Sequence, residues 1–214
     1  MSKSGLLLVH SIPLNYLVSL PYVDTSGTGT WPVLCFLHGL GEAAPMNIQV
    51  ALTLHGPLRA GNPLQVSSRF IVVAPQLPSP GGDIWIQYAT AVQQIVQTVQ
   101  AQYNGDSRRT YLTGFSFGGN GVLDLALVQP DFWAALWAVD LTRISAPPKR
   151  PIRLCLRQGH PRTNDFIAGL KLSPAPTDPK GNRLYTVGGR DHVDAATSAY
   201  GDNRIYDWLL EKHL

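Results

Sequence analysis

The residues with the clearest chemical potential lie at positions 114–119, where the sequence GFSFGG places Ser116 between glycines. The apolar run at 110–113 comes directly before this hexapeptide, and residues 120–129 continue with the spacing of an amphipathic helix. A strand, a sharp turn and a helix in this order are typical of a turn that exposes a nucleophilic serine. The flanking glycines let the strand and the helix approach closely. The sequence therefore predicts Ser116 as a nucleophile.

A serine hydroxyl is a weak nucleophile near neutral pH, so Ser116 needs a base to accept its proton. In folds that carry this turn, the order along the chain is nucleophile, acid and then histidine. Three histidines follow Ser116, namely His160, His192 and His213. We predict His192 as the base, because it lies in the glycine-rich segment VGGRDHVD between the last expected strand and the last expected helix. His160 is the alternative, and His213 is better explained as a charge at a helix end.

Two backbone amides must stabilise the oxyanion that forms when a serine attacks a carbonyl group. One is predicted to be the N–H of Phe117, which directly follows the nucleophile. The other is assigned to Leu40 in the segment LHGLGE, residues 37–42, because its glycines allow a turn that aims an amide at Ser116.

The expected strands bring these groups together. Residues 6–12 and 16–20 predict an N-terminal antiparallel hairpin. Residues 33–37 and 70–74 are continuous apolar runs, as in strands buried on both faces of a parallel sheet. Further strands are expected at 134–139, 152–156 and 184–187.

Helical spacing of apolar residues covers positions 84–103 and ends at Asn104, and a closing helix is expected over 203–214. Strands that alternate with helices predict an α/β fold with a mostly parallel sheet, helices on both faces and reactive groups at the carboxyl ends of the strands. No insertion is long enough for a large lid.

Composition favours a single globular domain over residues 1–214, since 44% of the residues are hydrophobic and only 14% are charged. The formal net charge is +3. One segment is crowded with basic residues: Lys149, Arg150, Arg153, Arg157 and Arg162. Because no aromatic residues alternate with them, we expect no nucleic-acid binding. A solvated rim is the simpler interpretation of this segment, and a guide for anionic substrates is the alternative.

Cys35 and Cys155 lie inside apolar runs and are expected to pack in the core, and a disulfide is the alternative. The N-terminal apolar stretch is short and interrupted by His10 and Pro13. We interpret it as a first strand, and we expect no signal peptide, no membrane span and a cytoplasmic location.

Together these motifs resemble the α/β-hydrolase superfamily, close to the phospholipase/carboxylesterase and acyl-protein thioesterase group and to predicted peptidases and polyhydroxybutyrate depolymerase-like esterases. The resemblance covers most of the chain and rests on these segments: WPVLCFLHGLGE, the HGP at residues 55–57, FIVVAPQ, RRTYLTGFSFGG and the tail that begins DHVDAATSAYGDN. It implies an α/β-hydrolase fold, Ser116 and His192 as catalytic residues, the amides of Leu40 and Phe117 as the oxyanion hole, and no cofactor or metal.

The acid is the point where this sequence departs from the family pattern, which places an aspartate in the loop after the seventh strand. In the loop QGHPRTND, an ungapped comparison puts Arg162 at that place. Asp165 becomes the leading candidate if the loop is a few residues longer. Asp140, which follows the strand expected at 134–139, is the second candidate. The remaining possibilities are Asp178, Asp191 and Asp194.

The leading functional hypothesis is a serine carboxylic ester hydrolase that acts on small-molecule esters with short to medium acyl groups. Trp85, together with Phe117, is expected to form an apolar wall of the substrate site. A serine peptidase or an acyl thioesterase could use the same groups. A non-catalytic protein that binds a ligand with this fold is the alternative from another class.

Overall fold

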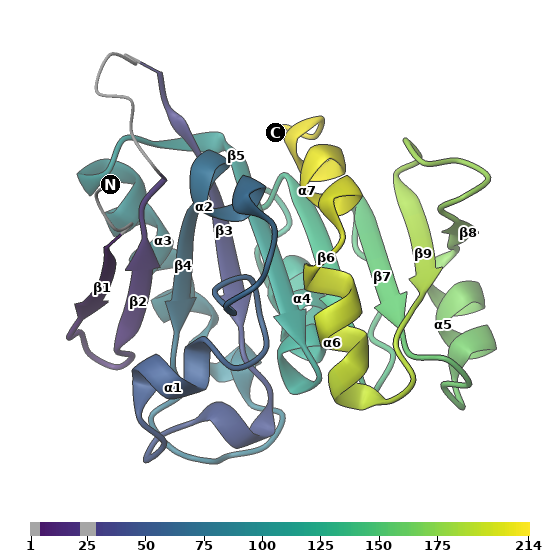
Figure 1. The fold of residues 1–214 in the computed structure, drawn as a ribbon, viewed down its shortest axis with the longest axis horizontal. Helices are drawn as coiled ribbons and strands as arrows, with labels where there is room; N and C mark the ends of the chain where they lie inside the picture. Colours follow the sequence, from purple (N-terminus) through teal and green to yellow (C-terminus); the bar gives the residue numbers. More distant parts are fainter. Residues whose placement is uncertain (1–4, 22–28) are drawn as a thin grey trace.

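The computed structural model describes residues 5–21 and 29–214 of the chain (Figure 1). The composition of residues 24–30, DTSGTGT, predicts a loop, and this segment lies largely outside the described residues. Within them, nine strands form one sheet: β1 (Leu6–Val9), β2 (Tyr16–Ser19), β3 (Trp31–Leu37), β4 (Ile71–Pro75), β5 (Gly105–Phe115), β6 (Ala135–Val139), β7 (Ile152–Leu156), β8 (Ser173–Pro174) and β9 (Arg183–Val187).

The strand order is β1-β2-β4-β3-β5-β6-β7-β9-β8. β1 and β2 pair as an antiparallel hairpin, and β2 joins β4 antiparallel, whereas all pairs from β4 to β8 are parallel. The prediction of a mostly parallel sheet with an N-terminal antiparallel hairpin is therefore confirmed. The apolar runs predicted as buried strands are β3, β4, β6, β7 and β9, and the strand before Ser116 is longer than its apolar part.

Helices cover both faces of the sheet. One face is packed by η2 (Trp85–Tyr88), α3 (Ala89–Gln102), α4 (Phe117–Val128) and α5 (Thr163–Leu170). The other is packed by α1 (Ile48–Leu52), α2 (Leu64–Arg69), α6 (His192–Tyr200) and α7 (Asn203–Leu210). Figure 1 shows α6 and α7 in front of the central strands and α3 and α4 behind them.

Alternation along the strands divides the core between these two faces. In β3, Val33 and Cys35 face the layer of α3 and α4, whereas Leu34 and Phe36 face the opposite layer. All four are buried because the sheet is covered on both sides. Cys35 and Cys155 are both buried and free, as core packing predicts, and they lie on opposite faces.

Several helices differ from the expected boundaries. The helix predicted over residues 84–103 begins as the 3-10 turn η2 and continues as α3, and the closing helix α7 ends at Leu210. The segment around His192, expected to be a loop, contains the first turn of α6. Among the described residues, no helix is both long and apolar enough to cross a membrane.

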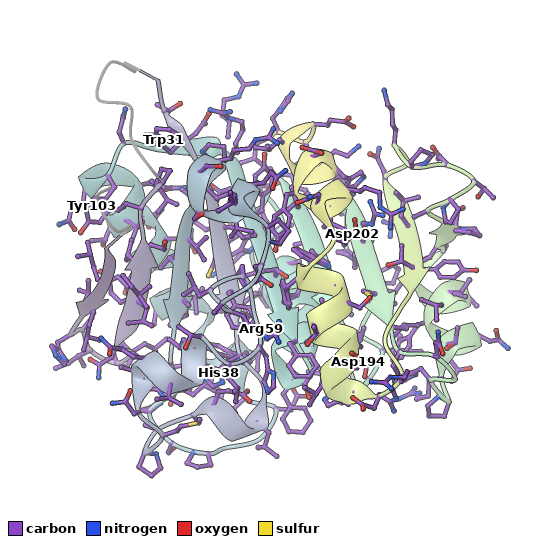
Figure 2. All side chains as sticks on the ribbon, in the orientation of Figure 1. Trp31, His38, Arg59, Tyr103, Asp194 and Asp202 are labelled. Carbon is purple, nitrogen blue, oxygen red and sulfur yellow. The ribbon has the colours of Figure 1, made fainter. Side chains whose placement is uncertain are left out.

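The parallel strands end at one edge of the sheet, which lies at the bottom of Figure 1. Figure 2 shows His38, which directly follows β3, and Asp194, in the first turn of α6, at this edge, and it shows Trp31 at the opposite edge. The two helices that follow His38 in the chain, η1 (Leu40–Glu42) and α1, have three and five residues. They are too short to form a large lid over this part of the described structure.

Candidate active site

Ser116 lies on a strained turn between β5 and α4. Its φ of 58° and ψ of −120° are unfavourable for a residue with a side chain. The turn is held because the Ser116 N–H donates to Val139 O at 2.9 Å. It also requires glycine at position 118, where an added Cβ would lie 1.9 Å from Leu37 O. The geometry therefore presents the Ser116 hydroxyl at the carboxyl edge, as the sequence motif predicts.

His192 reaches Ser116 from the other end of the chain. It is the first residue of α6, and its Nε2 lies 2.9 Å from the Ser116 Oγ. Its ring packs against Phe115, with 4.5 Å between the ring centroids. Asp191 caps α6 by accepting a hydrogen bond from the N–H of Asp194 at 2.8 Å. The helix start therefore fixes the position from which the imidazole reaches Ser116.

The carboxylate that contacts His192 is Asp140. Its Oδ2 lies 2.5 Å from Nδ1 of His192, and the side chain is fully buried. Arg157 holds the same carboxylate twice: its backbone N–H donates to Oδ1 at 3.0 Å, and its guanidinium binds Oδ2. Burial disfavours ionisation, but hydrogen bonds from His192 and Arg157 outweigh it and keep the pKa of Asp140 below its usual range.

Because Asp140 is ionised, the proton of the imidazole is on Nδ1, which donates to the carboxylate. The Nε2 atom of His192 is then free to accept the proton of the Ser116 hydroxyl. Ser116, His192 and Asp140 thus form a continuous chain of hydrogen bonds.

The prediction that Asp165 orients His192 is not met. Asp165 lies in the first turn of α5, its side chain is 61% exposed, and its carboxylate faces Arg162 at 3.5 Å. The loop after β7 instead supplies Arg157, a cation that binds the acid. The acid, Asp140, lies after β6, one strand before the loop where Asp165 was expected to supply it. β6 is the neighbour of β5 in the sheet, so Asp140 lies close to Ser116.

The alternative base, His160, is engaged elsewhere. Its Nδ1 accepts the N–H of Arg162 at 3.1 Å, and its ring packs against Phe166 with 5.2 Å between the centroids. With 7% of its surface exposed, His160 holds the loop after β7 together.

The predicted oxyanion donors lie beside Ser116. Phe117 and Leu40 are the first residues of α4 and η1, so the N–H of each lacks an acceptor within its own helix. The two segments are in close contact, since a Cβ added at Gly39 would lie 3.2 Å from the Cβ of Ser116.

His38 orients the Leu40 amide. The Leu77 N–H donates to Nε2 of His38 at 2.9 Å, so the proton is on Nδ1, which donates to Gly39 O at 2.6 Å. The carbonyl of Gly39 and the N–H of Leu40 belong to one planar trans peptide and point in opposite directions. Burial lowers the pKa of His38 to about 4, so the ring stays neutral at neutral pH. This orienting role requires the tertiary contact with Leu77, which the sequence pattern does not reveal.

The prediction that Trp85 lines the substrate site is wrong. Its side chain is fully buried in the layer of α3 and α4, and its Nε1–H donates to His38 O at 3.0 Å. The ring packs so closely on α4 that a Cβ added at Gly121 would lie 2.7 Å from it. Trp85 therefore supports the backbone on which Leu40 is placed and has no surface for a ligand.

Two further titratable groups lie beside the site. Glu42 is buried, with Oε2 unpaired among the described residues and Oε1 3.6 Å from Nε2 of His55. Burial raises the pKa of Glu42 and lowers that of His55. The His55 ring packs on Phe115 at 5.3 Å between centroids, on the residue that also contacts His192.

No protein-family model matches the chain, and none of the curated proteins does. Several solved structures, however, are similar to this chain. A structure described as a thermostable esterase matches with a TM-score of 0.73 and 20% identity, over 98% of this chain and 63% of that chain. This chain thus spans less than two thirds of that esterase.

Two shorter structures match over most of both chains. The feruloyl esterase module from Clostridium thermocellum, complexed with sinapinate, gives a TM-score of 0.64 at 14% identity, covering 96% of this chain and 86% of that one. The S-formylglutathione hydrolase from Staphylococcus aureus gives 0.62 at 15% identity, covering 96% and 95%. The sheet order, the turn at Ser116 and these similarities together show that the chain has the α/β-hydrolase fold.

Proposed function

We propose that this protein is a serine ester hydrolase that cleaves small-molecule carboxylic esters through an acyl-enzyme intermediate. The observation that carries the proposal is the chain of contacts from the Ser116 Oγ to His192 Nε2 at 2.9 Å and from His192 Nδ1 to Asp140 at 2.5 Å. A nucleophile, a base and an orienting carboxylate in this geometry suit acyl transfer.

In the proposed mechanism, Ser116 attacks the ester carbonyl carbon while His192 takes the hydroxyl proton on Nε2. The carbonyl oxygen becomes an oxyanion, which the N–H groups of Leu40 and Phe117 stabilise. The imidazolium of His192 then protonates the departing alkoxide, which leaves as an alcohol. Asp140 stabilises the imidazolium and keeps its ring oriented, and it stays ionised throughout.

Deacylation repeats these steps with water. His192 takes a proton from the water molecule, whose oxygen attacks the acyl carbon, and the same amides hold the second oxyanion. Collapse of this intermediate releases the carboxylic acid and returns the proton to Ser116. The residues present supply every proton transfer, so no cofactor enters the proposed reaction.

The leaving group is the finer part of the proposal. Two of the similar structures are described as a feruloyl esterase and an S-formylglutathione hydrolase, whose names indicate an oxygen ester and a thioester. Peptidase activity is the remaining alternative, because leaving-group preference depends on the shape of the substrate site. We propose oxygen esters with short to medium acyl groups, since no large helical lid among the described residues covers the edge near His38.

The experiment measures hydrolysis of p-nitrophenyl esters from acetate to decanoate by the wild type, Ser116→Ala and Ser67→Ala. Ser67 is a half-buried serine of α2, far from the site in sequence and on another element. Ser116→Ala is expected to abolish hydrolysis, and Ser67→Ala to retain it. Equal hydrolysis by Ser116→Ala and the wild type would contradict the proposal. Thioester and peptide substrates at matched concentrations test the leaving group.

A further inference from the structure

A cavity lies away from Ser116, between the outer strands and α7. It has a volume of about 880 Å³, and none of its lining residues belongs to the proposed catalytic site. It is bounded by β9, by the segment after β8 and by α7, which lie side by side in Figure 1. Its size is within the range of pockets that hold small organic molecules.

Arg153 of β7 lines this cavity and is almost completely buried, with 3% of its surface exposed. Within residues 5–21 and 29–214, its Nε has no hydrogen-bond partner, and its guanidinium takes part in no ion pair. A buried cation without a partner is costly, and buried charges in proteins are normally paired. The unpaired guanidinium at the wall of a cavity therefore points to an anion that occupies it.

Other charged groups around the cavity are largely neutralised by one another. Arg204 binds Asp202, labelled in Figure 2, through two nitrogens, each at 2.8 Å from a carboxylate oxygen. Asp207 is bound by Arg69 at 2.6 Å. Lys180 and Glu211 also line the cavity and belong to neither of these pairs. Together with Arg153, they give the cavity lining a net charge of +1 from groups outside the ion pairs. Burial lowers the pKa of Arg153, and the attraction of the Asp202 carboxylate only partly offsets this effect.

The walls of the cavity are mainly apolar. Pro176, Pro179 and Tyr185 contribute to them, together with Trp208 of α7. The Trp208 ring is held in place, because its Nε1–H donates to Gly181 O at 2.9 Å and only 2% of the residue's surface is exposed. An inorganic anion would leave this apolar surface uncovered, whereas an organic anion would cover it.

We propose that this cavity is a binding site for a small organic carboxylate, whose carboxylate group pairs with Arg153 and whose apolar body packs against Tyr185 and Trp208. The planar guanidinium matches a carboxylate through two parallel hydrogen bonds. This site is independent of the chemistry at Ser116. It gives Arg153 a role different from the rest of the basic segment, in which Arg157 binds Asp140.

The experiment uses benzoate as the probe and follows the indole N–H of Trp208 and the imidazole of His192 by NMR. Benzoate is expected to shift the Trp208 signal, assigned with Trp208→Phe, and to leave the His192 signal unmoved. Benzamide, which has the same shape without the charge, is expected to bind at least tenfold more weakly, because a charge-assisted contact is lost. Inorganic phosphate is expected not to compete at equal concentration.

Three variants separate this site from general charge effects. Arg153→Met is expected to weaken benzoate binding at least tenfold, with a melting temperature no lower than that of the wild type, because it removes an unpaired buried charge. Lys180→Met keeps Arg153 and is expected to weaken binding about threefold, as a rim charge does. Arg150→Met, a control outside the cavity, is expected to bind like the wild type.

The proposal is overturned if Trp208 does not respond to benzoate, or if benzoate moves His192 instead. It is also overturned if Arg153→Met binds benzoate as tightly as the wild type. If Arg153→Met does not fold, the same result with Lys180→Met overturns it. Equal binding of benzamide would show an apolar pocket without an anion site, and equal binding of phosphate would contradict the organic ligand.

Discussion

Asp140 and Ser116 occupy equivalent positions on neighbouring strands. Each is the first residue after its strand, and the preceding residues, Val139 and Phe115, are partners in the parallel pairing of β6 and β5. Both have positive φ angles, 43° and 58°. The sheet therefore places the acid and the nucleophile side by side at its edge, and His192 spans them from α6.

Asp140→Asn is expected to lower kcat by about three to four orders of magnitude, because an amide holds the imidazole in the wrong tautomer. Asp165→Asn is the matched control and is expected to change kcat less than twofold, since Asp165 is exposed and faces Arg162. Steady-state kinetics with p-nitrophenyl acetate measure both. A large loss in Asp165→Asn with full activity in Asp140→Asn would reverse the assignment.

Leu40→Pro tests the oxyanion donor directly, because proline lacks the N–H and is tolerated at the first position of a helix. Gly39 before it is extended, with φ −82° and ψ −164°, and so avoids the α region that a following proline disfavours. We expect kcat to fall by about two to three orders of magnitude. Leu40→Ala keeps the amide and is expected to retain activity; equal activity of both variants would argue against this donor.

Trp85→Phe removes the hydrogen bond to His38 O while keeping an aromatic ring in the core. A buried carbonyl left without its donor is expected to lower the free energy of unfolding by about 1–3 kcal/mol. Urea denaturation measures this loss. KM is expected to stay unchanged. A change in KM without a loss of stability would indicate that Trp85 contacts the substrate.

Gly118→Ala is expected to destabilise the fold by about 4 kcal/mol or more, because the new Cβ would collide with Leu37 O at 1.9 Å. Gly41→Ala is the comparison, since no atom of the described residues lies within 4 Å of a Cβ there. Thermal denaturation of the two variants should differ clearly. Equal melting temperatures would mean that β3 and α4 do not approach as closely as described.

The pKa of Asp140 is lower in the folded protein than its usual value, so the unfolded chain binds more protons in acid. The stability that Asp140 contributes is therefore fully present above its unfolded pKa of about 3.9 and is lost as the pH falls through its folded pKa. Urea midpoints measured from about pH 6 to pH 3 should fall less steeply for Asp140→Asn than for the wild type. Identical slopes would contradict this linkage.

Elements with continuous apolar runs could be predicted from the sequence, because strands buried on both faces need no polar residues. β3, β4 and β6 are of this kind. The short helices α1, α2 and α5 could not, since each has five to eight residues and too few apolar positions to show a period. α6 was missed because its start, GRDHVD, has the composition of a turn, and the capping role of Asp191 depends on the fold.

In the candidate site, Ser116 and His192 could be predicted because local sequence marks them: glycines around a serine and a histidine near the end of the chain. The acid depends on which strands are neighbours in the sheet, and this information is not local. The role of Trp85 could not be predicted for the same reason, since the sequence does not distinguish an aromatic residue that lines a pocket from one that supports a loop. The single-domain organisation and the cytoplasmic location stay predictions.

Activation of the Ser116 hydroxyl by His192 can be measured by mass spectrometry of the protein after treatment with a fluorophosphonate, which reacts with activated serines. We expect a single adduct on the peptide that contains Ser116. Labelling should be much slower in Asp140→Asn and absent in Ser116→Ala. A wild-type protein that stays unlabelled, or that is labelled equally after Ser116→Ala, would contradict the claim that His192 activates the Ser116 hydroxyl.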